Sequence, residues 1–346
     1  MAIPEFQVLY ETHLKPKLIT FEAKRKEIVI DLIFLLIGYI ILMIALFVVF
    51  VLLTEQAPPQ GEEDNPFVSI LIIGIFLITS GASYLYNKLV SPYKNSFKKE
   101  IVSRIVTFID NDLIYYPEKK ITRHEFDSSL LVKYWRHSVD RWHGEDYVQG
   151  ILGKTAVKFS EVHAEDEKNR GESTHYITVF KGLFFIFDFN KAFEGFTVVL
   201  PERIWPYGIY GDLVKLEDAE FEKEFVVYSD NQITARYILS PSLMRRLLKF
   251  HRELGKKVYL SFVNSKLHIG ISIDKNLFEP RIFRTILNFQ LIHEYLEYMQ
   301  LGKDIVEELN LNRRIWSKIG VKDFFQGTGT PILTSDHLKN MIRGSR

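Results

Sequence analysis

Two long apolar runs dominate the pattern of hydrophobic and polar positions along the chain. Residues 32–54 and 65–87 contain no charged side chain, and each run has 23 residues. A helix of that length spans about 34 Å, enough to cross a hydrocarbon core of roughly 30 Å. A buried core helix seldom runs so far without a charge, and a cleaved signal peptide has a shorter apolar region nearer the start. The pattern predicts transmembrane helices at residues 28–54 and 67–87.

Basic residues lie outside the two runs, and acidic residues lie between them. The bases closest to the runs are Lys15, Lys17, Lys24, Arg25, Lys26, Lys88, Lys94, Lys98, Lys99 and Arg104. The connecting loop, residues 55–66, has acidic side chains and no base. Because short cytoplasmic flanks carry the excess of Lys and Arg, we expect both termini on the inner side. The chain is therefore expected to be a multi-pass protein of the inner (cytoplasmic) membrane, with a cytoplasmic N-terminus and C-terminal domain.

Apolar stripes continue from both runs into the flanking segments, residues 1–27 and 88–110. Their side chains recur about one helical turn apart. The two stripes consist of Phe6, Tyr10, Leu14, Leu18 and Phe21, and of Phe97, Ile101, Ile105 and Ile109. Pro16 interrupts the first stripe, and a break is expected near Lys15 because proline removes a helical hydrogen bond. Both segments leave the same membrane face, so the pattern predicts an antiparallel helical stalk rather than a helix lying on lipid.

Residues 111–325 differ in pattern from the segments before them: runs of β-branched and aromatic residues are separated by Gly, Asn and Asp. Such runs predict strands. The expected strands are 147–149, 155–162, 176–180, 183–189, 197–200, 225–228, 258–263 and 266–273. Hairpin turns are expected at Gly150–Lys154 and at Asn264-Ser265, and a further turn at Lys181-Gly182. The apolar side chains of 183–189 would face both sides of the sheet, which predicts a central strand.

Helices are expected in the second half of this body, at residues 241–254, 281–302 and 304–309. Ser240 and Pro241 supply an N-cap and a first-turn proline for the first of them, and Gly255 ends it. Pro280 is expected to open the second. Strands and helices do not alternate as βαβ units, so the expected fold class is α+β, with a largely antiparallel sheet and C-terminal helices after the transmembrane hairpin and stalk. The tail, residues 326–346, is rich in small polar residues and is expected to be loose.

Composition and motifs exclude several functions. The net charge of +1 and the lack of a basic patch argue against a nucleic-acid partner. The chain has no cysteine and hence no thiol nucleophile. Gly153-Lys154-Thr155 resembles the end of a phosphate-binding loop, but Val148 occupies the position of the required first glycine. The two runs contain no charge that would mark a transport path. The sequence therefore predicts no cofactor and no metal.

One group of polar residues is the candidate site. Glu161, His163 and Glu165 alternate, so they would share one face of a strand, and His175 and Asp188 are expected to join them from a neighbouring strand. Carboxylates around a histidine can bind a cation or transfer a proton. A solvent-facing side of a strand explains the same residues and is the more common explanation. Asp188 is a candidate functional residue for a second reason, because burying a carboxylate in an otherwise apolar strand costs free energy unless the carboxylate is paired.

Several segments resemble the DUF3137 family of bacterial membrane proteins. They are residues 159–165, 180–190, 225–230, 235–241 and 305–312, together with the two N-terminal runs. The resemblance implies a two-span membrane protein of unknown function, and it assigns no catalytic residue. It also implies a protein partner, with a LemA-like membrane protein as the candidate.

These observations lead to one expected function and two alternatives. The first is a two-pass membrane protein whose cytoplasmic α+β domain is a binding or scaffolding module. The second is a membrane-anchored enzyme that uses the face formed by Glu161, His163 and Glu165. The third is a ligand-sensing membrane effector. The expected partners are the lipid bilayer, a protein and a further copy of the chain, since small residues in the second run, such as Gly74 and Gly81, suit close helix packing.

Overall fold

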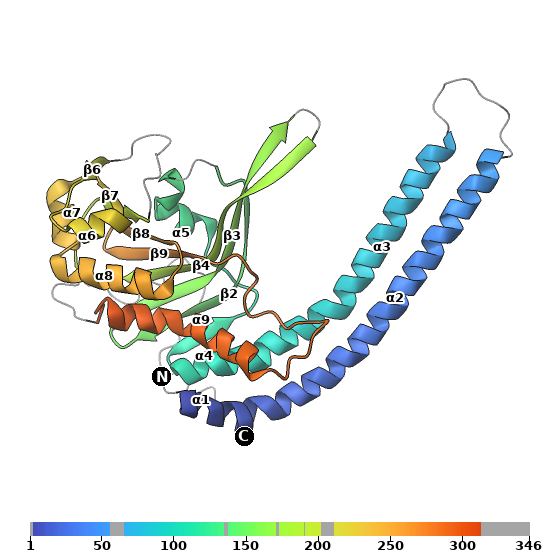
Figure 1. Ribbon diagram of the computed structural model, residues 1–346, viewed down its shortest axis with the longest axis horizontal. Helices are drawn as coiled ribbons and strands as arrows, with labels where there is room; N and C mark the ends of the chain where they lie inside the picture. Colours follow the sequence, from blue (N-terminus) through green and yellow to red (C-terminus); the bar gives the residue numbers. More distant parts are fainter. Residues whose placement is uncertain are drawn as a thin grey trace. The chain divides into compact units, whose positions relative to one another are not determined.

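The computed structural model describes residues 3–55, 66–134, 138–170, 173–189, 191–201 and 211–312 (Figure 1). The chain divides into two compact units. Residues 1–102 and 279–292 form the first, and residues 103–278 and 293–346 form the second. The predicted loop 55–66 and the tail 326–346 lie almost wholly or wholly outside the described residues.

The first unit consists mainly of two long helical segments. One contains α1 (Ile3–Leu9), the π-helical turn η1 (Tyr10–Leu14) and α2 (Lys15–Glu55), and the other contains α3 (Pro66–Phe97) and the π-helical turn η2 (Lys98–Val102). The expected break near Lys15 takes the form of a change in helix type: the π-helical turn η1 ends at Leu14, and the regular helix α2 begins at Lys15. Single π-helical turns and prolines are both known sites of bends in helices.

The long helices α2 and α3 pack against each other along the two predicted stripes. The ring of Phe21 lies 5.9 Å from that of Tyr93 and 5.6 Å from that of Phe97, measured between centroids. The Lys17 ammonium lies 2.6 Å from the Glu100 carboxylate. These contacts pair the segment before the first apolar run with the segment after the second, which is the arrangement of an antiparallel stalk.

The long helix expected at residues 281–302 begins later than predicted. Helix α9 extends from Phe289 to Glu308 and includes residues 304–308 of the shorter helix expected at 304–309. Residues 281–288 are non-helical because their backbone groups bond to α2. Arg25 Nη1 donates to Ile282 O at 2.8 Å, and the Ile286 amide donates to Glu22 Oε2 at 3.1 Å. The side chain of Asn288 then accepts from the Gln290 amide at 2.9 Å and starts the helix.

Within the described residues, the second unit contains a nine-stranded sheet whose neighbouring strands are antiparallel, as predicted. Their order is β1-β2-β3-β4-β9-β8-β5-β7-β6. The strands are β1 (Leu113–Tyr116), β2 (Arg141–Leu152), β3 (Thr155–Arg170), β4 (Ser173–Asp188), β5 (Phe196–Leu200), β6 (Asp212–Val214), β7 (Val226–Ser229), β8 (Val258–Val263) and β9 (Lys266–Ser272). The hairpin turns at Gly153 and at Asn264-Ser265 are confirmed, and β4 is central.

The turn predicted at Lys181-Gly182 is wrong, because β4 continues through both residues. Gly182 has φ +147°, and a Cβ at this position would lie 2.0 Å from the carbonyl oxygen of Ile271 on β9. The glycine therefore permits a close approach of two strands instead of a reversal of the chain.

Helices cover both faces of the sheet. The Phe126 ring of α5 (Arg123–Ser128) lies 4.8 Å from Phe184, while Gly302 of α9 packs on Phe159 and Phe185. Phe184 and Phe185 are consecutive on β4, so α5 and α9 lie on opposite faces. The remaining helices of this unit are α4 (Ser103–Ile109), the 3₁₀ turn η3 (Leu131–Tyr134), α6 (Ala219–Glu224), α7 (Gln232–Ile238) and α8 (Pro241–Leu254).

Candidate functional site

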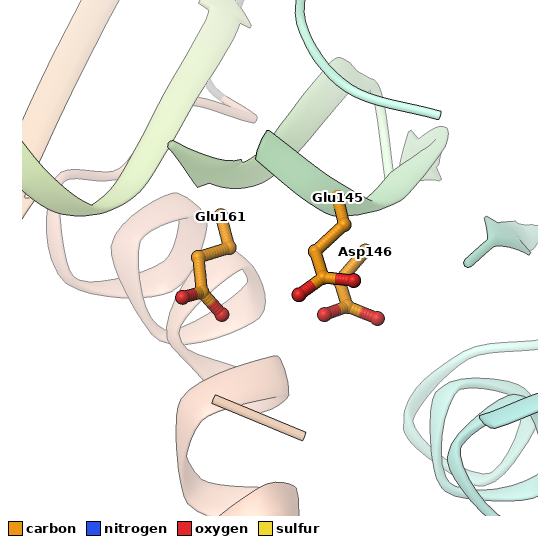
Figure 2. A group of neighbouring side chains, drawn as sticks. All are labelled: Glu145, Asp146 and Glu161. Carbon is orange, nitrogen blue, oxygen red and sulfur yellow. The ribbon is translucent and has the colours of Figure 1, made fainter. Parts of the chain in front are cut away.

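A β-bulge in β2 brings three carboxylates together. Glu145 pairs with Glu161 of β3, and the next pair is Val148 with Phe159, so β2 has one extra residue between these pairs. Asp146, inside the bulge, has φ +60°. A bulge interrupts the alternation of side chains along a strand. Glu145 and Asp146 are therefore both able to point toward Glu161, although they are adjacent in sequence (Figure 2).

The carboxylate cluster, which we define as Glu145, Asp146 and Glu161, is compact and largely shielded from solvent. Carboxylate oxygens of the three residues lie within 4.8 Å of one another. The exposed fraction is 0% for Asp146 and 6% for Glu161, and Glu145 is half-buried. Carboxylates are rarely buried to this extent unless hydrogen bonds, cations or protons compensate the charge.

Hydrogen bonds fix the two buried carboxylates. The hydroxyl of Tyr115 donates to Asp146 Oδ1, and the amide of Leu277 donates to Glu161 Oε2 at 2.9 Å. The backbone of the bulge is fixed as well, because the Asp146 amide donates to Pro117 O at 3.0 Å. The cluster is thus held by β1, β2, β3 and the segment that follows β9.

An all-oxygen group of this kind has two chemical uses. Hard cations such as Mg²⁺ and Ca²⁺ prefer carboxylate oxygens, and carboxylates this close can also share a proton. Both uses lower the repulsion among the three groups.

The structure places the predicted residues Glu161, His163 and Glu165 on one face of β3. The intervening Val162 and Ala164 are buried in the core on the other face. His163 Nε2 lies 3.2 Å from Thr178 Oγ1 and 3.7 Å from Glu165 Oε1. Partial burial lowers the pKa of His163 below its ordinary value. The negative charge of the nearby Glu165 acts to raise this pKa, but burial has the larger effect.

The other two predicted residues lie elsewhere. His175 is exposed and pairs with Lys168, seven residues along β3 from Glu161, which corresponds to roughly 23 Å. Asp188 is buried at the opposite end of β4, where it pairs with Lys266. The structure therefore does not bring His175 and Asp188 to the carboxylate cluster.

Sequence reasoning missed Glu145 and Asp146 as partners of Glu161. The adjacent acidic pair inside a strand was the available signal. Adjacent residues of a regular strand point to opposite faces, so this pair can face Glu161 only at a bulge. The position of the bulge depends on the pairing of β2 with β3.

A second polar group, also missed from the sequence, lies on the face of the sheet that α5 covers. Lys158 is 3% exposed, and its ammonium lies 2.5 Å from Glu125 Oε1. Burial acts to raise the pKa of Glu125, but the Lys158 charge and hydrogen bonds from Thr122 outweigh it, so the pKa lies below its ordinary value.

His268 belongs to the same row of the sheet as Lys158. The register runs from Lys158 through Ile186 to His268 and then to Ser261. His268 is 2% exposed, and its Nδ1 has no hydrogen-bond partner among the described residues. Burial, assisted by the charge of Lys266, lowers the pKa of His268 to about 3. This face of the sheet therefore holds a buried ion pair and a neutral histidine.

Comparisons with known proteins support the family resemblance and give no activity. The model of the family DUF3137, a protein of unknown function, matches residues 178–311. A comparison with curated proteins found no match. Among solved structures, the crystal structure of the mycobacterial trehalose monomycolate transport factor A, TtfA, is similar at 14% identity and a TM-score of 0.29. The similarity covers 60% of this chain and 95% of that one, and a TM-score of this size carries no inference about fold or function.

Proposed function

We propose that this chain, whose residues 178–311 match the DUF3137 family, is a two-pass membrane protein with a cytoplasmic α+β binding module. One observation carries the membrane part of the proposal. In the most apolar 18-residue stretch of each long helix, only 6% of the first stretch and 0% of the second are buried within the protein. An apolar surface of this extent is stable only when another apolar phase covers it. A bilayer supplies that phase along the uncharged runs of both helices.

The proposed orientation follows from charge. Lys and Arg lie on both flanks and are absent from the loop between the runs. This pattern favours both termini, and with them the β-rich unit, on the cytoplasmic side.

Cysteine labelling tests both the membrane location and the orientation, since the natural chain has no cysteine. Single cysteines are introduced as Gly61→Cys in the loop and as Ile233→Cys on α7, where the native side chain is 81% exposed. In intact spheroplasts, a membrane-impermeant maleimide is expected to label only the first. The second is expected to react once the membrane is opened.

Val48→Cys is the matched control. Val48 is 49% exposed in α2 and lies within the first apolar run. If a bilayer covers this side chain, its cysteine stays unlabelled until a denaturing detergent is added. Rapid labelling of Val48→Cys in opened membranes would contradict the proposal, and labelling of Ile233→Cys in intact spheroplasts would reverse the orientation.

The proposed binding module acts at the cytoplasmic membrane surface. A LemA-like membrane protein is the candidate partner that the family resemblance implies. Affinity purification of the full chain in mild detergent tests this role. We expect a stable partner in a fixed ratio to the chain.

A membrane-anchored enzyme is the second candidate, and the contact between His163 and Glu165 favours it. A histidine with a lowered pKa is neutral near pH 7 and is able to accept a proton. In this case, a chromosomal His163→Gln substitution is expected to reproduce the phenotype of a gene deletion at an unchanged protein level. A wild-type phenotype for His163→Gln, with the deletion phenotype intact, would remove this candidate.

A further inference from the structure

A groove lies between α2 and α3 within the first unit. Its volume is about 650 Å³, and leucine, isoleucine and small side chains form most of its lining. Lys88 and Tyr39 are its polar members. Binding sites for small molecules typically have volumes of about 300–1,000 Å³, mostly apolar walls and a few polar groups. The groove has these properties.

Close helix contacts bound the groove at both ends. Toward the connecting loop, a Cβ at Gly74 would lie 2.8 Å from a methyl carbon of Leu46, so the helices touch there. Toward the stalk, the rings of Phe21 and Tyr93 are in edge contact. Between these contacts the hydroxyls of Tyr39 and Thr79 lie 3.5 Å apart, and Tyr39 lines the groove, so the opening is limited to one part of the apolar pair.

Glycines keep the groove open. Gly38 of α2 and Gly81 of α3 both line it, and a Cβ on either residue would meet no atom within 4 Å. These two glycines thus do not bring the helices into contact, as glycines commonly do in paired membrane helices. They leave an open space within the groove that another molecule can occupy.

The groove has the polarity and length of one lipid leaflet. Its lining on α3 extends from Ile78 to Leu89, about 17 Å along the helix and about half of a hydrocarbon core of roughly 30 Å. Lys88 is the first charged residue after the second apolar run, and no described carboxylate forms an ion pair with it. A cation therefore lies where lipid headgroups begin, and apolar walls continue from it toward the bilayer centre.

We propose that this groove binds an anionic phospholipid of the cytoplasmic leaflet, with an acyl chain between Gly38 and Gly81 and the phosphate at Lys88. The inference rests on the proposed membrane location. Basic pockets between membrane helices on the cytoplasmic side bind anionic headgroups in the same way. A helix from a second copy fits less well, because it would continue along the full hairpin, whereas the groove is closed at Leu46 and Gly74.

The test uses the full chain, extracted from vesicles that contain equal amounts of phosphatidylcholine and phosphatidylglycerol, and native mass spectrometry of the lipid that remains bound. The expected result is one retained phospholipid per chain, enriched in phosphatidylglycerol. Gly81→Leu fills the groove and is expected to remove the adduct. Lys88→Gln keeps the apolar space and is expected to reduce the preference for phosphatidylglycerol about fivefold, or about 1 kcal/mol.

Two neighbouring substitutions are the matched controls. Ser80→Leu adds the same side chain at an exposed position beside Gly81 that does not line the groove. Lys26→Gln removes one exposed positive charge from the other flank of the apolar pair. Both variants are expected to retain the lipid adduct of the wild type, with an unchanged headgroup preference.

Three results would overturn the lipid site. Equal adducts for the wild type, Gly81→Leu and Lys88→Gln would place the lipid elsewhere. Efficient disulfide dimers of Ala82→Cys in the membrane, without a retained lipid, would assign the groove to a second copy. Recovery of the full chain in the soluble fraction of cells would overturn the membrane proposal as well, whereas the first two results would leave it intact.

Discussion

Lowering the pH from 7 to 4.5 is expected to destabilise the β-rich unit by roughly 2–3 kcal/mol through His268 alone. The pKa of this histidine is about 3 in the folded protein, against an ordinary value of 6.5. Between these values the unfolded chain binds the proton and the folded protein does not. The contribution to stability is therefore complete above pH 6.5 and is lost as the pH falls toward 3.

Chemical denaturation of the full chain in detergent, followed by tryptophan fluorescence at several pH values, measures this effect. Trp142 reports on the unit, because its ring lies 4.3 Å from that of Phe126 in the core. His268→Leu is expected to flatten the decline between pH 6.5 and pH 4.5. His175→Gln, an exposed histidine on β4, is the control and is expected to keep the wild-type decline. Equal pH dependence for wild type and His268→Leu would refute the assignment.

Glu125→Gln is expected to lower the free energy of unfolding by about 2–3 kcal/mol. The ammonium of Lys158 is buried and would lose the carboxylate that lies 2.5 Å away. Breaking a buried pair at one partner typically costs about 3–5 kcal/mol, and the partial exposure of Glu125 reduces this value. Glutamine keeps the capping box that Glu125 forms with Thr122, so the substitution isolates the charge.

The double variant Glu125→Gln/Lys158→Met is the control for this result. It removes both charges and replaces the lysine stem with an apolar chain of similar length. Most of the lost stability is expected to return, because the cost arises from a buried charge without this partner rather than from a missing attraction. If the double variant is as unstable as the sum of Glu125→Gln and Lys158→Met, the two side chains do not act as a pair.

Local signals sufficed for much of the fold. Helix α8 begins at Pro241 and ends before Gly255, which has φ +61°, as predicted from those two residues. The turn at Asn264-Ser265 likewise has positive φ at both positions. Such features depend on the backbone preferences of a few neighbouring residues, and the sequence displays them directly.

Errors arose where distant residues determine the local structure. Gly182 resembled a turn residue, but the nearby carbonyl of Ile271 is what requires a glycine there. Residues 281–288 have a helical apolar pattern, yet Glu22 and Arg25, more than 250 positions earlier, bind their backbone groups. The candidate site also combines a local and a distant part. Glu161, His163 and Glu165 share a face by simple alternation along one strand, which the sequence displays. Glu145 and Asp146 reach Glu161 only through a bulge.

Four features could be predicted from the amino-acid sequence alone: the two uncharged runs, the charge asymmetry around them, the antiparallel α+β class and the central position of the strand at 183–189. Each of these depends on composition or on a short periodicity. Which polar groups meet depends on how the chain folds. The carboxylate cluster and the Lys158–Glu125 pair depend on particular strand registers, because their members are apart in sequence and only packing brings them together. The burial of His268 and the open space beside Gly38 and Gly81 likewise depend on how strands and helices pack.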